Sequence, residues 1–189
     1  MFPRTLLKLL IVIQSVSLIF MLAPSLQASR TRRYNTLELA RLAERIVVAR
    51  LIGAEARLEP RSRLVFTYNT FELSEVIKGR SPGQIFVLRL VGGAVGTRIV
   101  QVEGMPRFTA SEEVILFLGP DNEDGYPTVY GLSEGVYRIR KDINDDPVVV
   151  TPITGLAVTT SAIKSGRAQL AGPEPRLRDV VRAIKRALR

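Results

Sequence analysis

The chain of 189 residues contains no cysteine, no histidine and no tryptophan. Without cysteine and histidine it cannot form a disulfide, a Ser-His-Asp triad, a Cys-His nucleophile, or an ordinary zinc, haem or iron–sulfur site. An enzyme with this composition would have to rely on carboxylates, serine and lysine. We therefore expect a protein without enzymatic activity and without a cofactor or metal.

Hydrophobic residues make up 46% of the chain and charged residues 24%. These proportions are typical of a folded domain with its own core, and they exclude a collagen or a disordered chain. The net charge of +9 is unevenly spread. Residues 164–189 hold eight basic and two acidic residues, whereas residues 29–163 hold 17 basic and 16 acidic residues. A strongly basic surface is therefore expected only at the C-terminal end.

The first 28 residues have the composition of a secretory signal peptide. Arg4 and Lys8 give a positively charged start, residues 9–22 are almost wholly apolar, and small residues lead to Ala28. The apolar run is shorter than the ~20 residues of a membrane-spanning helix. We predict a signal peptide over residues 1–28, cleaved after Ala28, and a secreted or periplasmic protein. An uncleaved membrane anchor is the alternative.

The folded part is expected to begin with one short helix and to continue as β-strands. Asn35 can cap the helix, and Glu38 stands three residues later, which is the spacing of a capping box. The chain that follows alternates short runs of β-branched and aromatic residues with turns rich in glycine, proline and aspartate. The expected strands cover residues 46–54, 64–77, 85–91, 98–102, 113–118, 128–132, 136–139 and 148–150.

The longest expected strand changes face halfway. Leu64, Phe66 and Tyr68 share one face, whereas Phe71 and Leu73 fall on the other. This change of phase predicts a β-bulge near Asn69 and Thr70. A long strand that changes face suits a small, strongly bent sheet. The sequence therefore predicts a mainly β fold, with a small closed OB-like β-barrel over residues 29–150.

The order of these elements resembles a known family. The residues that carry the resemblance are the apolar runs 46–50 and 114–118, the strand end at 76–79, the turn at Gly92-Gly93 and the stretch 104–108. Over about residues 37–140 the pattern resembles the OB-like barrel of the netrin-module and tissue-inhibitor-of-metalloproteinase superfamily, and more closely secreted bacterial proteins that share it. The resemblance implies the fold alone. The animal inhibitors chelate zinc through an N-terminal cysteine, which this chain lacks.

Several motifs that could carry chemistry have a simpler interpretation. Ser161 and Lys164 match the S-x-x-K pattern of penicillin-recognising enzymes, but the companion S-D-N and K-T-G elements are missing from the sequence. The glycines at 92, 93 and 96 lack the helix that follows a phosphate-binding loop, so we interpret them as a tight turn. The carboxylates at 72 and 75, and at 112 and 113, are not expected to converge.

Two acidic turns offer oxygen ligands that calcium could use. They contain three carboxylates each: Asp121, Glu123 and Asp124 in the first, and Asp142, Asp145 and Asp146 in the second. Neither follows the EF-hand register, because Pro147 stands where such a loop requires glycine. We interpret both turns as solvated hairpin tips. The sequence thus predicts no catalytic, cofactor-binding or metal-binding residues.

The end of the chain has the clearest helical pattern, over residues 176–189. Its apolar face comprises Leu177, Val180, Val181, Ile184 and Leu188, and its basic stripe comprises Arg178, Arg182, Lys185 and Arg189. A basic amphipathic helix can lie on anionic lipid, bind nucleic acid, dock a partner or pack on its own domain. We favour packing, because the apolar face has no tryptophan or phenylalanine to anchor it in a bilayer. Residues 151–175 are then a linker between barrel and helix.

Three functional hypotheses follow. The one we favour is a secreted, non-enzymatic binding module of the bacterial cell envelope that holds a protein, peptide or glycan. The second is an envelope-attached protein whose C-terminal helix binds anionic lipid or polysaccharide. The third, an enzyme that uses carboxylates or a serine–lysine pair, is disfavoured by the composition. Nucleic acid is not expected as a partner, because the barrel region is almost neutral.

Overall fold

The computed structural model describes residues 34–151 and 174–189. Contacts divide the chain into the units Met1–Arg32 and Arg33–Arg189, and both hydrophobic clusters lie in the second unit. The expected signal peptide, most of the expected linker, and Ser161 and Lys164 lie outside the described residues. In the described part of the chain, no helix has both the length and the apolar character needed to span a bilayer.

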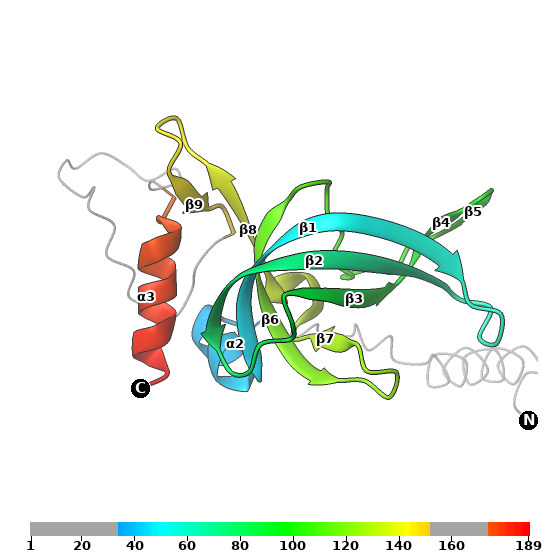
Figure 1. Cartoon of the computed structure of the whole chain (residues 1–189), viewed down its shortest axis with the longest axis horizontal. Helices are drawn as coiled ribbons and strands as arrows, with labels where there is room; N and C mark the ends of the chain where they lie inside the picture. The colour runs from blue at the N-terminus through cyan, green and yellow to red at the C-terminus, as the bar shows by residue number, and fades with distance from the viewer. Residues whose placement is uncertain (1–33, 152–173) are drawn as a thin grey trace, which may run out of the picture. The chain divides into compact units, whose positions relative to one another are not determined.

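The fold is mainly β, as the sequence predicts (Figure 1). A helix, α2, precedes nine strands, and a second helix, α3, ends the described chain. The elements are α2 (Thr36–Leu42), β1 (Arg45–Leu58), β2 (Val65–Lys78), β3 (Ile85–Val91), β4 (Gly93–Val95), β5 (Arg98–Val100), β6 (Glu113–Asp121), β7 (Pro127–Val129), a 3-10 turn (Leu132–Gly135), β8 (Val136–Lys141), β9 (Pro147–Val149) and α3 (Leu177–Ala187).

Helix α2 begins and ends on side-chain caps. The Asn35 side chain accepts a hydrogen bond from the Glu38 backbone N–H at 2.8 Å, and the Glu38 carboxylate accepts one from the Asn35 N–H at 3.0 Å. The predicted capping box is therefore confirmed. At the other end, Lys78 donates from Nζ to three carbonyl oxygens, those of Ala40, Arg41 and Ala43. Burial lowers the pKa of Lys78 from its ordinary value.

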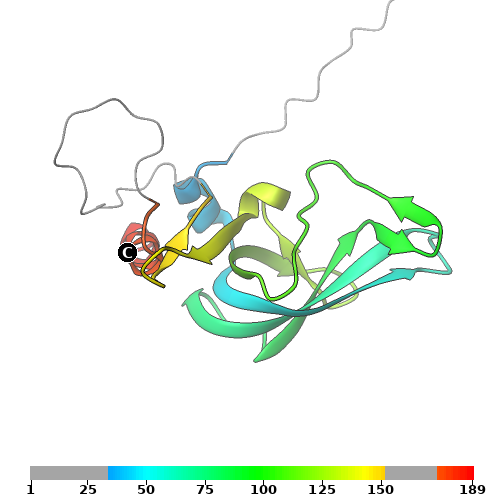
Figure 2. The same ribbon diagram turned by 90° about the horizontal axis from the view of Figure 1, so that it is seen from above.

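Seven strands form one antiparallel sheet in the order β3-β2-β1-β6-β8-β9, and β7 adds to β6. The sheet is strongly curled around the long β1–β2 hairpin (Figure 2). The closed barrel that the sequence led us to expect is not found, because the described strands do not complete a hydrogen-bonded circle. Strands β3 and β7 come close to each other without pairing. The structure is thus a curled, open sheet.

Side chains hold together the seam where a barrel would close. Arg89 on β3 pairs with Asp124 in the turn between β6 and β7, at 2.5 Å, and its guanidinium lies 4.6 Å from the ring centre of Phe66 and 5.2 Å from that of Tyr126. The Arg89 side chain is only 13% exposed. Burial opposes its charge, yet the hydrogen bonds and carboxylate contacts around it raise the pKa of Arg89 overall. Charge and stacking therefore replace backbone pairing at this seam.

Two hydrophobic clusters lie on opposite faces of β1 and β6. Ile46, Val48 and Phe117 point to one face, where α2 and α3 cover them, and Val47 and Leu116 point into the curl of the sheet. Because both faces are covered, these strand segments are continuous apolar runs rather than alternating ones. That is the physical reason for the uninterrupted runs that the sequence shows at 46–49 and 114–118.

The predicted change of face in β2 near residue 69 is wrong. Val65, Asn69 and Phe71 are all buried on the same face, and Phe66 and Tyr68 lie half-buried on the outer face, where arginines cover their rings. The register shift at this level lies in β1, where Ile52 is the extra residue between Leu51 and Gly53. Phe66 and Tyr68 have the apolar character of core residues but lie on the outer face of β2. The bulge is in β1, the strand that pairs with β2.

Helix α3 packs on the sheet, as the favoured interpretation expected. Val180, Val181 and Ile184 are buried in the same cluster as the residues under α2. The chain before the helix pairs with the edge of the sheet, through the bridge between Val148 and Arg176. The basic stripe is exposed. In Figure 1, α2 and α3 lie at one end of the β1–β2 hairpin, and β4 and β5 lie at the other.

Candidate functional site

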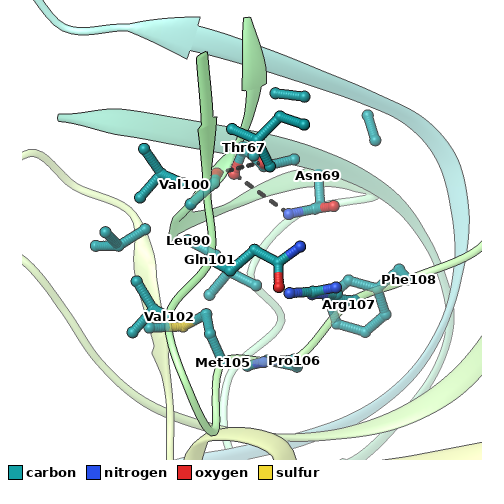
Figure 3. Close-up of a pocket in the computed structure, with 16 residues that line it drawn as sticks. Thr67, Asn69, Leu90, Val100, Gln101, Val102, Met105, Pro106, Arg107 and Phe108 are labelled. Atoms are coloured by element: carbon teal, nitrogen blue, oxygen red, sulfur yellow. Dashed lines mark hydrogen bonds between the residues drawn. The ribbon is translucent and has the colours of Figure 1, made fainter. Parts of the chain in front are cut away.

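A cavity of about 300 Å³ opens at the end of the curled sheet far from the helices. The inner faces of β1, β2 and β3 form one side, and the segment from β4 to residue 108 forms the other (Figure 3). Its size is at the lower end of the range of small-molecule pockets. The residues that line the cavity include Ala54, Thr67, Asn69, Leu90, Gln101, Met105, Arg107 and Phe108.

Small side chains leave this part of the sheet hollow. The bulge at Ile52 changes the face of β1, so that Leu51 is the last large inward residue and Ala54 follows in the lining of the cavity. On the other side of the cavity stand Gly92 and Gly93. A core built of larger residues at these positions would be filled, because protein interiors pack densely.

The glycine pair is required by close packing as well as by its backbone angles. Gly92 and Gly93 have φ values of 109° and 136°, a region that side chains rarely allow. A Cβ on Gly93 would lie 2.5 Å from the Thr67 Oγ1 and 2.9 Å from the Ala56 Cβ. Thr67 in turn donates a hydrogen bond to the Gly92 carbonyl oxygen at 2.6 Å. The interpretation of these glycines as a tight, non-phosphate turn fits this geometry, although residues 93–95 form a short strand rather than a loop.

Asn69 is a buried polar residue in the wall of the cavity. It is 4% exposed, and its Nδ2 donates hydrogen bonds of 3.3 Å to the carbonyl oxygens of Thr67 and Leu88. Among the described residues, nothing donates a hydrogen bond to its Oδ1. In the described part of the chain, the only buried side-chain nitrogen or oxygen without a hydrogen-bond partner is the Arg45 Nε. The Asn69 Oδ1 is thus not sealed in the core, and the residue lines the cavity. The Asn69 Oδ1 is therefore an acceptor available to a ligand.

The wall opposite the sheet is held in place from outside the cavity. Arg138 on β8 pairs with the Glu112 carboxylate and donates to the Arg107 carbonyl oxygen at 2.8 Å. Glu112 also accepts from the Thr109 backbone N–H at 2.8 Å. The Phe108 ring packs edge-on against Phe71 with ring centres 5.0 Å apart. The wall is thus preorganised, which lowers the entropy cost of binding.

The rim of the cavity carries the polar groups that can orient a ligand. The side chains of Gln101 and Arg107 lie together on one side of the cavity, across from Asn69 (Figure 3). Arg107 is exposed, and no carboxylate among the described residues pairs with its guanidinium. Chemically, the site offers an apolar floor, carboxamide groups and one positive charge.

A second hollow, of about 440 Å³, continues from the first along β1. The two share Ala54 and Phe108 in their linings. The second runs beside residues 50–54 of β1, with Phe108, Ala110 and Ser111 on its other side. Together they form a groove that begins at the edge of β1 and deepens into the cavity.

The carboxylates that the sequence analysis weighed for catalysis do not converge. Glu72 pairs with Arg50 at 2.6 Å, Glu75 pairs with Lys185 at 2.8 Å, and Glu112 pairs with Arg138. Each of these three carboxylates has a cationic partner of its own, whereas Glu113 lies opposite Arg50 on β1 and has no ion pair among the described residues. This arrangement fits the expectation that the carboxylates do not converge.

Most carboxylates of the two acidic turns also have hydrogen-bond or ion-pair partners within the protein. The Asp142 carboxylate accepts from the backbone N–H groups of Asn144 and Asp146, the pattern of an Asx turn. Four other acidic side chains pair with cations: Asp121 with Arg45, Asp124 with Arg89, Asp145 with Lys141 and Asp146 with Arg176. A search of the described residues finds no cluster of three metal-ligating side chains.

The basic stripe of α3 borders a shallow groove of about 340 Å³. Two of its cations have partners, since Arg182 lies 3.5 Å from Asp179 and Lys185 lies 2.8 Å from Glu75. Within the described residues, Arg178, Arg186 and Arg189 have no carboxylate partner. This surface of α3 is cationic, and the apolar face of the helix is buried in the core.

Comparison with known proteins gives no match: no family model, no curated protein and no solved structure is significantly similar to the chain. The site therefore has to be interpreted from its own chemistry. The cavity could not be predicted from the sequence, although Asn69, the Gly92-Gly93 pair and the stretch 104–108 stand out in it for other reasons. One feature of the sequence could have indicated the cavity: Asn69 is a polar residue at a position of β2 whose side chain points inward, as those of Val65 and Phe71 do.

Proposed function

We propose that the protein is a non-enzymatic binding module, and that its site is the cavity at the open end of the curled sheet. The observation that carries the proposal is the combination of a cavity lined by apolar and polar groups with the Asn69 Oδ1, an acceptor to which no described residue donates. Ligand sites typically combine apolar walls with a few placed polar groups in this way. The ligand that fits has an apolar body, a hydrogen-bond donor for Asn69 and a negative charge for Arg107.

The polar groups of the cavity favour binding over catalysis. They are the Thr67 hydroxyl, two carboxamides and a guanidinium, whereas general acid–base catalysis at neutral pH uses groups that titrate near neutrality. The proposed signal peptide over residues 1–28 makes the ligand one that is met outside the cytoplasm. The curled sheet supports, at the level of architecture, the proposed relation to OB-like secreted proteins.

A fluorescent aromatic sulfonate, 1-anilinonaphthalene-8-sulfonate, tests the proposal, because it joins an apolar body to a negative charge. We would titrate residues 29–189, which contain both hydrophobic clusters, and compare variants. Ala54→Leu fills the cavity and is expected to weaken binding at least about tenfold, or about 1.4 kcal/mol. Arg107→Gln removes the charge and is expected to weaken binding by about threefold to tenfold.

Two controls match these variants. Asn144→Leu adds one apolar residue at the exposed tip of the β8–β9 hairpin, and Arg80→Gln removes one exposed charge outside the cavity. Both are expected to bind the probe as the parent chain does. If the probe does not bind, or if Ala54→Leu binds it unchanged, the cavity is not the site.

The cationic groove of α3 supports a second candidate function. Three of its arginines have no carboxylate partner among the described residues, so an anionic polysaccharide or lipid surface could bind there by charge. The apolar face of α3 is buried, so this attachment would be electrostatic and would weaken steeply with salt. Arg178→Gln with Arg186→Gln would abolish retention on an anionic polymer at low salt, and leave the sulfonate titration unchanged.

A further inference from the structure

The outer half of β1 has an unpaired edge next to the cavity. Strand β6 pairs with β1 only as far as Arg50 opposite Glu113, and the last hydrogen bond runs from the Leu51 N–H to the Glu112 carbonyl oxygen at 2.8 Å. From Gly53 to Leu58, β1 pairs with β2 on one side, and among the described residues no strand pairs with it on the other. Along this edge, over about 20 Å, the N–H and C=O groups of alternate residues have no strand partner in the described chain.

The chain before β6 turns away from this edge and leaves room for another strand. Residues 109–112 form a turn in which the Glu112 N–H donates to the Thr109 carbonyl oxygen at 3.1 Å, and Ser111 has a φ of 61°. The Glu112 and Arg138 side chains fix this turn from behind. The hollow of about 440 Å³ therefore lies where a longer β6 would have continued.

An extended segment in this hollow would reach the cavity through its side chains. Side chains of a strand alternate between faces, and the hollow joins the cavity at Ala54 and Phe108. One inward side chain would then enter the cavity, and its neighbours would lie along Ile52, which is 50% exposed. Edge pairing gives affinity through the main chain, and such pockets give specificity.

The charges beside the groove indicate which side chains a bound segment would carry. Arg107 has no carboxylate partner among the described residues, and Arg50 stands at the other side of the hollow with Glu72 as its partner. An acidic side chain on the segment would complement Arg107. A second copy of this chain would instead offer its own β1 edge, which carries Glu55 and Arg57 already paired with each other at 2.6 Å.

We propose that the ligand is an extended acidic peptide, which adds as a strand to the free edge of β1, places one apolar side chain in the cavity and pairs an acidic side chain with Arg107. This proposal rests on the proposed function of the cavity. It specifies the class of ligand and the way it binds.

The probe is a synthetic pool of heptapeptides with leucine fixed at the centre, aspartate fixed two positions to either side, and threonine, valine or serine elsewhere. We expect the pool to displace the aromatic sulfonate from residues 29–189. Ala54→Leu and Arg107→Gln are expected to weaken displacement at least about threefold, and Asn144→Leu and Arg80→Gln to leave it unchanged.

Two further pools carry N-methyl groups on alternate amides, offset from each other by one residue. Only one set of amides in an added strand faces its neighbour, so one pool is expected to lose at least about tenfold in affinity, whereas the other binds as before. When the unmodified pool binds, hydrogen exchange is expected to slow at those amides of residues 52–58 that face the free edge.

The possible failures are distinguishable. If the sulfonate binds but no pool displaces it, or if both N-methylated pools displace it equally, strand addition is wrong and the cavity remains the binding site. If neither the sulfonate nor any pool binds, both proposals are wrong. If sedimentation shows a dimer in which the amides of residues 52–58 are already protected, a second copy occupies the edge and the peptide proposal is overturned.

Discussion

The two halves of the β1 strand show how one strand can serve two purposes. From Ile46 to Ala49 it is paired on both edges and covered on both faces, by the helices on one side and by the curl of the sheet on the other. From Ile52 to Leu58 it is paired on one edge, and small residues leave a cavity over its inner face. One bulge at Ile52 separates the halves. Stability thus resides in the first half, and the second half is free to bind.

The largest expected contrast between the halves comes from truncating one buried and one exposed apolar residue. Phe117 lies opposite Ile46 and is fully buried, whereas Ile99 on β5 is 69% exposed. Phe117→Ala is expected to lower the free energy of unfolding by about 3 to 5 kcal/mol, and Ile99→Ala by less than about 0.5 kcal/mol. Urea denaturation measures both. Equal losses would contradict the conclusion that packing against the first half of β1 stabilises the fold.

A matched pair of glycine variants sharpens the comparison within the binding half. Gly93→Ala places a Cβ against Thr67 and Ala56, at a φ of 136°, and is expected to cost about 2 kcal/mol or more. Gly96 also has a positive φ, of 57°, but no atom lies within 4 Å of a Cβ added there. Gly96→Ala is therefore expected to cost about 1 kcal/mol. Thermal unfolding distinguishes them, and a smaller loss for Gly93→Ala would mean that β4 does not form the cavity wall.

The seam between β3 and the β6–β7 turn gives the next largest effect. Arg89→Met keeps an apolar stem but removes the pair with Asp124 and the stacking on Phe66 and Tyr126. We expect a loss of about 1 to 2 kcal/mol, since the guanidinium is mostly buried. Arg57→Met is the control, because Arg57 and its partner Glu55 are exposed, and we expect no measurable change. Equal stability of the two variants would show that the contacts of Arg89 do not stabilise the curled sheet.

The smallest expected effect is on the stability at alkaline pH, and it comes from Tyr137 beside the covered half of β1. Tyr137 lies under α2, shares a hydrogen bond of 2.7 Å with Thr36, and has its pKa raised from 10.0 mainly by burial. The unfolded chain therefore loses the phenol proton at a lower pH than the folded chain, and stability falls as pH rises past about 10. Tyr137→Phe is expected to remove that part of the pH dependence, and to cost about 1 kcal/mol at neutral pH for the lost hydrogen bond. An unchanged alkaline slope would contradict the burial of this phenol.

The local features of the fold could be predicted from the sequence. The capping box of Asn35 and Glu38, the amphipathic face of α3 and the positions of most strands depend on neighbours in the chain, and the structure confirms them. The inner and outer faces of β2 could not be assigned, because the rings of Phe66 and Tyr68 look like core residues until Arg89 and Arg57 are found stacked on them.

The openness of the sheet and the candidate site depend on contacts between distant residues. Closure of the barrel depended on whether β3 and β7 exchange hydrogen bonds, and no local pattern encodes that pairing. The cavity depends on Ala54, Asn69, Gly93 and Phe108 meeting in space, and none of these residues is unusual on its own. Their meeting can be recognised only when the register between β1 and β2 is known, and the bulge at Ile52 sets that register.

The most direct test of the binding half is an NMR titration of isotope-labelled residues 29–189 with the aromatic sulfonate. We expect the amide signals of Ala54, Asn69, Leu90 and Phe108 to shift together and saturate, while those of Val48 and Phe117 in the covered half stay in place. Shifts centred on Arg178 and Arg186 in α3, or shifts spread evenly through both halves of β1, would contradict the assignment of binding to the cavity.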